Sequence, residues 1–472
     1  MATSKYTTLD VKRKTLKINL DPGIYGTVAE IGAGQEVARS FFQAGGASGT
    51  VAKTISAYDM TMSDAIYGDA PKRYVCLPRL DQMLDYEFDQ LTTTLASKQK
   101  EKKFFAFADT VEAINYSRTN RCHGWMGVRF QDGENEEFNE VVIHIRMLDN
   151  DNPTQQQAIG MLGINLIYGC YFHSNEPKTL ITSLMDNFAP GRIQIDMVRF
   201  TGPAFKNVDN RLMSLFLVKS NYADAVMFTP EGTSIHPTEL LYKKDILALR
   251  GRFRPVTHVH MDMLENSKKM FEKDPKVDPK KVVCITEITL NDLSGSDYID
   301  EKDFLDRVDL LGELGQTVLI SNFQEYYKLA TYLTRYNTGA QIGIVLGANS
   351  LINIFNYKYY KKLNGGLLEA FGKLFHKDVR LYLYPYKFRK ELITTDNMLI
   401  PDNYDYLFKY LISNGKIIDF DEHNAENLHI FSHKVLELIE AGKDWESLVP
   451  KRIAIKIKEQ ELFKYKAKLI EK

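Results

Sequence analysis

The chain has 472 residues, too many for one ordinary hydrophobic core, so we expect two or three domains. Its formal net charge of −1 supplies no global field that would recruit nucleic acid or an anionic membrane, and we expect neither as a partner. The 4 cysteines lie far apart without a CxxC pair, which argues against a structural zinc site and a disulfide framework. The first residues are charged rather than apolar, unlike a secretory signal, and the longest apolar stretch is too short to span a bilayer. We therefore expect a soluble cytoplasmic protein.

The first 190 residues predict a mixed α+β domain. A glycine-dense segment, 23–49, is typical of a strand that ends near Ile31, a glycine turn, and a helix over residues 35–43. The other predicted strands are 15–20, 50–58, 104–108, 125–131 and 141–148. The other predicted helices are 80–95, 153–172 and 179–188.

From residue 191 onward, strand-like and helix-like segments alternate. The eight predicted strands are 193–200, 223–229, 254–263, 282–289, 317–322, 342–347, 379–385 and 416–420. The predicted helices between them include 209–219, 237–249, 304–314 and 326–336. The strands begin roughly every 30 residues, the usual length of one βα unit. We predict an α/β fold in which residues 191–424 form a (β/α)8 barrel. An open doubly wound sheet is the alternative, because periodicity does not show whether a sheet closes. Residues 425–472 are predicted to be a helical tail.

The glycine-dense segment is the first candidate binding site. A strand that ends in Glu30 and is followed by a glycine turn resembles the first motif of nucleotide-fold methyltransferases, in which a helix N-terminus receives an adenosyl ligand. A second glycine cluster offers backbone amides for a phosphate. The third glycine of GxGxxG is missing, so a simple tight turn is the alternative. The predicted cofactor-binding residues are Glu30, Gly32, Gly34, Gly45, Gly46, Gly49 and Asp59.

A second candidate lies at His258, His260 and Asp262. On a strand, alternate side chains point to the same face, so these three would lie together. Metal-dependent amidohydrolases use such an HxH pair, but they also need histidines at the ends of later strands, which this sequence lacks. We therefore expect no metal here, and polar side chains that line a barrel.

Barrel enzymes carry their active sites where strands end and βα loops begin. Those positions give Glu231, Glu287, His260 and Asp262 as predicted catalytic residues, with a glutamate as general base. The same positions give Arg199, Lys243, Asn291 and Asn322 as predicted substrate-binding residues. Helix capping is the alternative role for several of them.

Long runs such as GTVAEIGAGQEVARSFF, GGASGTVAKTISAYDM and GGLLEAFGKLF resemble a widespread family of bacteria and photosynthetic lineages. The resemblance covers residues 23–421. Members of this family often carry a nicotinate-nucleotide adenylyltransferase label that was transferred from other proteins. That chemistry uses an HxGH-type motif to hold phosphates and an ISSTxxR-type helix start. Both are absent here, since 320–323 lacks the threonine and the arginine, so no catalytic residue is carried over.

Two functions from different classes follow. The first is an enzyme that acts on a small phosphorylated or nucleotide-like substrate at the barrel mouth. The second is a non-catalytic protein that assembles into a homo-oligomer or filament, using some of its 26 Tyr, 26 Phe and 15 Met at interfaces. A pocket in which charged side chains converge at strand ends favours the enzyme, whereas a large apolar surface favours assembly.

Overall fold

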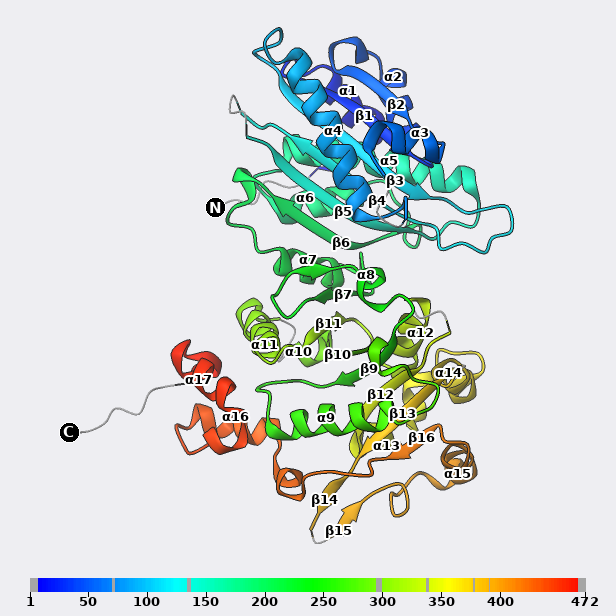
Figure 1. Cartoon of the computed structure of the whole chain (residues 1–472), viewed down its shortest axis with the longest axis vertical. Helices are drawn as coiled ribbons and strands as arrows, with labels where there is room; N and C mark the ends of the chain where they lie inside the picture. Colours follow the sequence, from blue (N-terminus) through cyan, green and yellow to red (C-terminus); the bar gives the residue numbers. More distant parts are fainter. Residues whose placement is uncertain are drawn as a thin grey trace, which may run out of the picture. The chain divides into compact units, whose positions relative to one another are not determined.

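The chain divides into two compact units, Met1–Ala223 and Asp224–Lys472. A computed structural model describes residues 7–69, 73–133, 137–293, 299–336, 339–376, 378–389 and 391–465, and Figure 1 traces the order of their helices and strands. The division falls after residue 223 rather than after the predicted 190. The reason is that the strand Ile193–Thr201 pairs within the first sheet.

The first unit is built on a six-stranded sheet with the order β2-β1-β3-β4-β5-β6. The strands are β1 (Ile24–Ile31), β2 (Val51–Ser56), β3 (Lys103–Glu112), β4 (His123–Phe130), β5 (Asn139–Met147) and β6 (Ile193–Thr201). The neighbours β2, β1 and β3 are parallel, whereas β4, β5 and β6 each run antiparallel to the strand before them. The first unit therefore combines parallel and antiparallel strands in one mixed sheet.

Helices cover both faces of this sheet. They are α1 (Val11–Asn19), α2 (Gln35–Ala44), α3 (Met60–Tyr67), α4 (Leu77–Leu95), α5 (Asn152–Phe172), α6 (Pro177–Leu184) and α7 (Asn210–Lys219). Helix α4 buries Leu80 and Leu84 against one face, beside Trp125. On the other face α2 and α5 touch each other, and Gly163 of α5 approaches Phe107 of β3. The predicted strand 15–20 is wrong, because Asp10 accepts a hydrogen bond from the Arg13 amide and starts helix α1 there.

The second unit contains an eight-stranded sheet with the order β16-β13-β12-β9-β10-β11-β7-β8. The strands are β7 (Ala225–Phe228), β8 (Ser234–Ile235), β9 (Asp245–Arg250), β10 (Val282–Thr289), β11 (Thr317–Ser321), β12 (Ile342–Gly347), β13 (Val379–Tyr384) and β16 (Ile417–Asp419). The six strands from β16 to β11 are parallel, and β7 and β8 are antiparallel additions beside β11. Counted from β9, the parallel strands follow the 3-2-1-4-5-6 order of a doubly wound Rossmann fold.

The α/β class is therefore confirmed, but the predicted barrel is wrong and the open alternative is right. The sheet runs from β16 at one edge to β8 at the other. The predicted barrel strand 193–200 belongs to the first unit, and the predicted strand 254–263 covers a loop and the start of helix α9 (His258–Glu272). The central strand β9 had been included in the predicted helix 237–249. That helix, α8, ends at Leu241, and the strand follows after three residues.

The remaining elements pack on both faces of this sheet and beyond it. They are α10 (Leu290–Leu293), α11 (Glu301–Glu313), α12 (Tyr326–Tyr336), α13 (Ala348–Ile354), α14 (Gly366–Leu374), α15 (Asp405–Ser413), α16 (Ser432–Glu440), α17 (Lys451–Glu459), and the hairpin of β14 (Tyr386–Phe388) and β15 (Glu391–Ile393). In the helical tail, Trp445 and Ile453 are buried in one cluster with Leu310 of α11. Over the described residues, no helix has both the length and the apolar character needed to cross a bilayer.

Candidate functional site: a polar crevice at the switch point of the second sheet

The order of strands in the second unit creates a switch point beside β9. The chain passes from β9 through α9 to β10 on one side, and later returns through α12 to β12 on the other side. Helix α12 packs on one face, with Leu329 and Leu333 in the main core. Helix α9 packs on the opposite face, where Phe271 contacts Gly343 of β12. Loops that leave the carboxyl ends of β9 and β12 therefore diverge, and such a crevice is where open α/β sheets bind ligands.

A cavity of about 350 Å³ occupies this position. Residues that follow β9, β10, β11 and β12 line it, so each wall comes from a different βα connection. Its lining residues are Arg250, Arg252, Thr289, Asn291, Asp292, Gln324, Glu325, Tyr326, Ser350, Asn353, Ile354, Tyr359 and Tyr360. Most are polar, and three are tyrosines. The cavity thus combines charged groups, amides, hydroxyls and aromatic rings in one place.

A buried ion pair between Arg250 and Glu287 lies at the base of the crevice. The two residues are register partners on the parallel strands β9 and β10. Arg250 Nε donates to Glu287 Oε2 at 2.7 Å and Nη2 donates to Oε1 at 3.0 Å, while Ser321 Oγ donates to the same Oε1 at 2.6 Å. Burial lowers the pKa of Arg250, but the charge and hydrogen bonds of Glu287, together with the charges of Tyr326 and Asp292, more than offset this and the pKa is raised. Arg250 is therefore held as a cation that is paired with the Glu287 carboxylate.

Aromatic rings form one wall. The Arg250 guanidinium lies 4.3 Å from the ring centroid of Tyr326, the first residue of α12. Burial raises the pKa of Tyr326, so this phenol stays neutral. Tyr360 is fixed by a hydrogen bond from its hydroxyl to the Ile354 carbonyl at 2.7 Å, whereas Tyr359 is 37% exposed. The wall presents flat apolar surface next to a cation.

Arg252 is the exposed cation of the crevice, with 73% of its side chain accessible. Its Nε lies 3.3 Å from Asp292 Oδ1, while Asp292 Oδ2 accepts a hydrogen bond from Thr289 Oγ1 at 2.7 Å. An ion pair this exposed is worth little in water. Arg252 is therefore able to exchange Asp292 for an incoming anion at small cost.

The structure brings two of the predicted site residues to this crevice, Glu287 and Asn291. Arg250 and Ser321 donate hydrogen bonds to both carboxylate oxygens of Glu287, an arrangement that does not favour the predicted role as a general base. Its role is to hold Arg250 in place. Asn291, at the start of α10, lines the cavity as a substrate-binding residue would.

Three other predicted residues lie away from the crevice. Glu231 lies exposed in the β7–β8 turn, and Lys243 lies in the turn before β9. Both turns are at the amino edge of the parallel strands, because β7 runs antiparallel to β11. Asn322 follows β11 and donates its backbone amide to the Asp224 carbonyl. The prediction for Glu231 and Lys243 depended on barrel strands that this fold does not contain.

The predicted face of His258, His260 and Asp262 does not exist, because all three lie in the first turns of α9. His260 Nδ1 accepts a hydrogen bond from the Thr257 amide at 3.0 Å and completes a capping box. Burial lowers the pKa of His260 to about 4. Asp262 accepts hydrogen bonds from the Tyr384 hydroxyl and the Asn424 amide, and so joins α9 to β13 and to the tail. His260 and Asp262 therefore make structural contacts, and the barrel strand on which their predicted catalytic roles depended is a helix.

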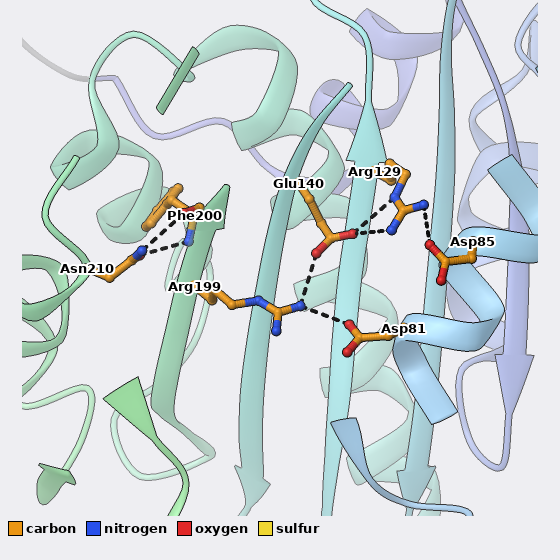
Figure 2. Close-up of polar contacts among 7 residues, drawn as sticks. All are labelled: Asp81, Asp85, Arg129, Glu140, Arg199, Phe200 and Asn210. Atoms are coloured by element: carbon orange, nitrogen blue, oxygen red, sulfur yellow. Dashed lines mark hydrogen bonds and ion pairs between the residues drawn. The ribbon is translucent and has the colours of Figure 1, made fainter. Parts of the chain in front are cut away.

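Arg199 lies on β6 of the first unit, in a sheet separate from that of Glu287, so one barrel mouth does not unite them. Figure 2 shows its guanidinium between Asp81 of α4 and Glu140 of β5, with Nη2 at 2.8 Å and 3.0 Å from their carboxylates. Glu140 also accepts two hydrogen bonds from Arg129, which pairs in turn with Asp85. These ion pairs connect α4 to β4, β5 and β6. The charge of Arg199 is therefore already paired with two carboxylates.

The glycines that were predicted to bind a cofactor lie at the two opposite ends of helix α2. Gly32 and Gly34 lie in the turn before α2, close to Glu30 at the end of β1. Gly45, Gly46 and Gly49 follow α2 at its other end, roughly 15 Å away for a helix of this length. The two glycine clusters therefore do not form one anion site. Asp59 caps α3 by accepting a hydrogen bond from the Met62 amide at 2.9 Å, and has a structural role.

Sequence reasoning missed Arg250, Arg252 and Tyr326. The two arginines were missed because strand β9 was predicted as part of a helix, and only residues at the ends of predicted strands were considered as site residues. The signal that would have found them is the short run 245–250, followed by Gly251 and four further residues, the last of which is Pro255. Tyr326 was missed because it opens a helix whose apolar spacing explains it equally well.

Comparisons with known proteins leave the family open. No family model matches the sequence, and no curated protein matches it. Among solved structures, the chain resembles the competence/damage inducible protein CihA from Agrobacterium tumefaciens with 15% identity and a TM-score of 0.25, over 35% of this chain and 97% of that chain. It also resembles a competence-damaged protein (CinA) superfamily protein from Enterobacter cloacae with 13% identity and a TM-score of 0.27, over 36% and 97%. Similarity at this level carries no argument about function.

Proposed function

We propose that the second unit binds a small nucleotide-like or phosphorylated molecule in the switch-point crevice. One observation carries this proposal. A polar cavity of about 350 Å³, with two arginines and three tyrosines in its walls, opens at the carboxyl ends of the central strands of a Rossmann-ordered sheet. A cavity of that size suits a mononucleotide better than a peptide or a polymer.

Each part of such a ligand has a partner in the crevice. Arg252 offers exposed N–H donors to a phosphate, and guanidinium groups recognise phosphate through paired hydrogen bonds. Asp292, after β10, is placed where doubly wound folds hold a ribose hydroxyl. Tyr326 and Tyr359 provide flat surfaces for a base. Arg250 does not serve as the phosphate ligand, because Glu287 already compensates its charge.

The proposal is tested by titration calorimetry of the full chain against inorganic phosphate, ADP, ATP and NAD. We expect at least one nucleotide to bind wild type, and Arg252→Gln to weaken that binding about tenfold, the loss expected for one charge-assisted hydrogen bond. Arg335→Gln is the matched control, because Arg335 also forms a partly exposed pair, with Asp224 at 3.0 Å, and does not line the cavity. Wild type that binds no member of the panel contradicts the proposal.

Self-association is the second candidate function, and an exposed aromatic face favours it. Tyr406 and Tyr410 lie one turn apart on α15 with 88% and 61% of their surface exposed, and the nearby Leu399 is 88% exposed. We propose this face as a contact between copies of the chain. Light scattering after size exclusion should show a dimer or larger species that Tyr406→Lys with Tyr410→Lys dissociates. Tyr116→Lys in the first unit, also fully exposed, should leave it intact. Monomeric wild type contradicts this candidate.

A further inference from the structure

Two acidic side chains are buried together at the carboxyl edge of the first sheet. Glu30 and Asp109 are register partners on the parallel strands β1 and β3, so their side chains leave the same face of the sheet. Glu30 is 6% exposed and Asp109 is 0% exposed. The pair lies at a switch point, since the chain leaves β1 through α2 on one face and reaches β3 through α4 on the other. This is the position at which an open α/β sheet binds a ligand.

The hydrogen bonding of the pair is incomplete. Within the described residues, Glu30 Oε2 and both carboxylate oxygens of Asp109 form no hydrogen bond of ordinary geometry. Ser56, at the end of β2, donates a hydrogen bond to Glu30, and the Ile31 backbone amide lies close enough to Asp109 to lower the pKa of that carboxyl group. No lysine or arginine of the described chain contributes to the electrostatics of either group. Buried carboxylates are ordinarily paired with a base or fully hydrogen-bonded. Glu30 and Asp109 have neither arrangement, which leaves a place for a positively charged partner.

The turn between β1 and α2 leaves room for the Asp109 carboxylate because it contains a glycine, Gly34. A Cβ atom on Gly34 would lie 2.0 Å from Asp109 Oδ2, so no other residue fits at position 34 while Asp109 keeps its place. Gly32 has φ +101° and directs the chain over the end of β3, where the Val111 carbonyl lies close to it. Gly34 thus leaves room for the Asp109 carboxylate, while Gly32 allows the chain to turn over the end of β3.

We propose that Glu30 and Asp109 bind a divalent cation of the Mg²⁺ or Mn²⁺ class. Three unpartnered carboxylate oxygens from two adjacent strands supply the hard oxygen ligands that these ions prefer, and Mg²⁺ is commonly held by one or two carboxylates with water or a phosphate in its remaining positions. The Ser56 hydroxyl orients Glu30 from outside the ligand set. This site lies in the first unit and does not depend on the function proposed for the second.

The test is titration of the full chain, freed of metal with EDTA and dialysed, with Mn²⁺ alone. Bound ion is counted by electron paramagnetic resonance and calorimetry. We expect about one Mn²⁺ per chain, and at least a tenfold loss of affinity in Asp109→Asn and in Glu30→Gln, each of which removes one charged ligand. Asp89→Asn, an exposed acid on α4, is the matched control and should bind as wild type does.

Circular dichroism shows which variants fold, and Glu30→Gln decides the matter if Asp109→Asn does not fold. Wild type that takes up no Mn²⁺ overturns the proposal, because the pair is then closed by a shared proton. Mn²⁺ binding that survives in both Glu30→Gln and Asp109→Asn also overturns it, since the ion then lies elsewhere.

Discussion

Each unit has a buried glutamate near the carboxyl end of a parallel strand, and the residue opposite it on the neighbouring strand differs: an arginine in the second unit and an aspartate in the first. In the second unit, Glu287 faces its register partner Arg250 across parallel strands, and the two charges cancel. In the first unit, Glu30 faces Asp109 across parallel strands, and no base among the described residues pairs with either carboxyl group. The backbone geometry is the same, so the difference lies in one residue of each pair. A buried acid that is paired with a base needs no further partner, whereas two buried acids that face each other need a proton or a bound cation to compensate their charge.

The largest effect is expected where the balanced pair is broken. Arg250→Met leaves Glu287 buried without a counter-charge and should lower the free energy of unfolding of the second unit by about 3–5 kcal/mol. Arg250→Met with Glu287→Met should recover most of that loss, because no buried charge then remains. Urea unfolding followed by hydrogen exchange of peptides from β9 to β12 measures both. A loss under about 1 kcal/mol would mean that Glu287 is not held as a buried ion.

A smaller effect, with a definite sign, is expected from pH in the first unit. Burial, only partly countered by the Ser56 hydrogen bond, raises the pKa of Glu30 to about 7 from an ordinary 4.5. The folded state therefore holds this proton more tightly than the unfolded chain. The resulting stability is fully present below pH 4.5 and is lost as the pH rises through about 7.

The unfolding free energy of wild type relative to Glu30→Gln should accordingly fall by about 3 kcal/mol between pH 4.5 and pH 8 in the presence of EDTA. The comparison with Glu30→Gln removes the contributions of the other titrating groups except Asp109, whose pKa is raised in part by the charge of Glu30. A difference that stays flat across this range would show that Glu30 is ionised in the folded protein. A difference that rises would show that a base compensates it.

The smallest effect concerns the glycine turn above the acidic pair. Gly34→Ala should destabilise the first unit by about 2 kcal/mol, because the added methyl overlaps the Asp109 carboxylate and forces it aside. Gly372→Ala is the control in the second unit, since that glycine lies in helix α14 with no atom near its absent Cβ. The control should be neutral or stabilising by about 0.5–1 kcal/mol. Equal effects of the two substitutions would show that a methyl group at position 34 does not displace the Asp109 carboxylate.

Much of the fold could be predicted because most elements carry a clear periodicity. The strand Ile342–Gly347 and the helix Tyr326–Tyr336 have the predicted bounds. The errors arose at short elements whose residues suit either state. The run Asp245–Arg250 is rich in leucine and alanine, which favour helices, yet its place between β12 and β10 makes it a strand. The alternating histidines at 258–260 suggested a strand, but a capping box begins a helix there.

The candidate sites depended on these elements and were predicted less well. Glu287 and Asn291 were found because they end a strand that was recognised. Arg250 was missed because it ends one that was not. Asp109 was missed although the sequence contains a signal, namely one acid inside the apolar strand 103–112. Its partner, Glu30, was predicted as a cofactor-binding residue, but the pairing with Asp109 was not predicted, since spacing alone does not reveal which strands become neighbours.

Native mass spectrometry of the purified protein, incubated with ATP, ADP or NAD, measures whether the switch-point crevice of the second unit holds a nucleotide. We expect wild type to retain one nucleotide per chain, Arg252→Gln to lose it under the same conditions, and Arg335→Gln to retain it. If wild type shows only the mass of the bare chain, or if Arg252→Gln retains the nucleotide as well as wild type does, the crevice is not a nucleotide site that depends on Arg252.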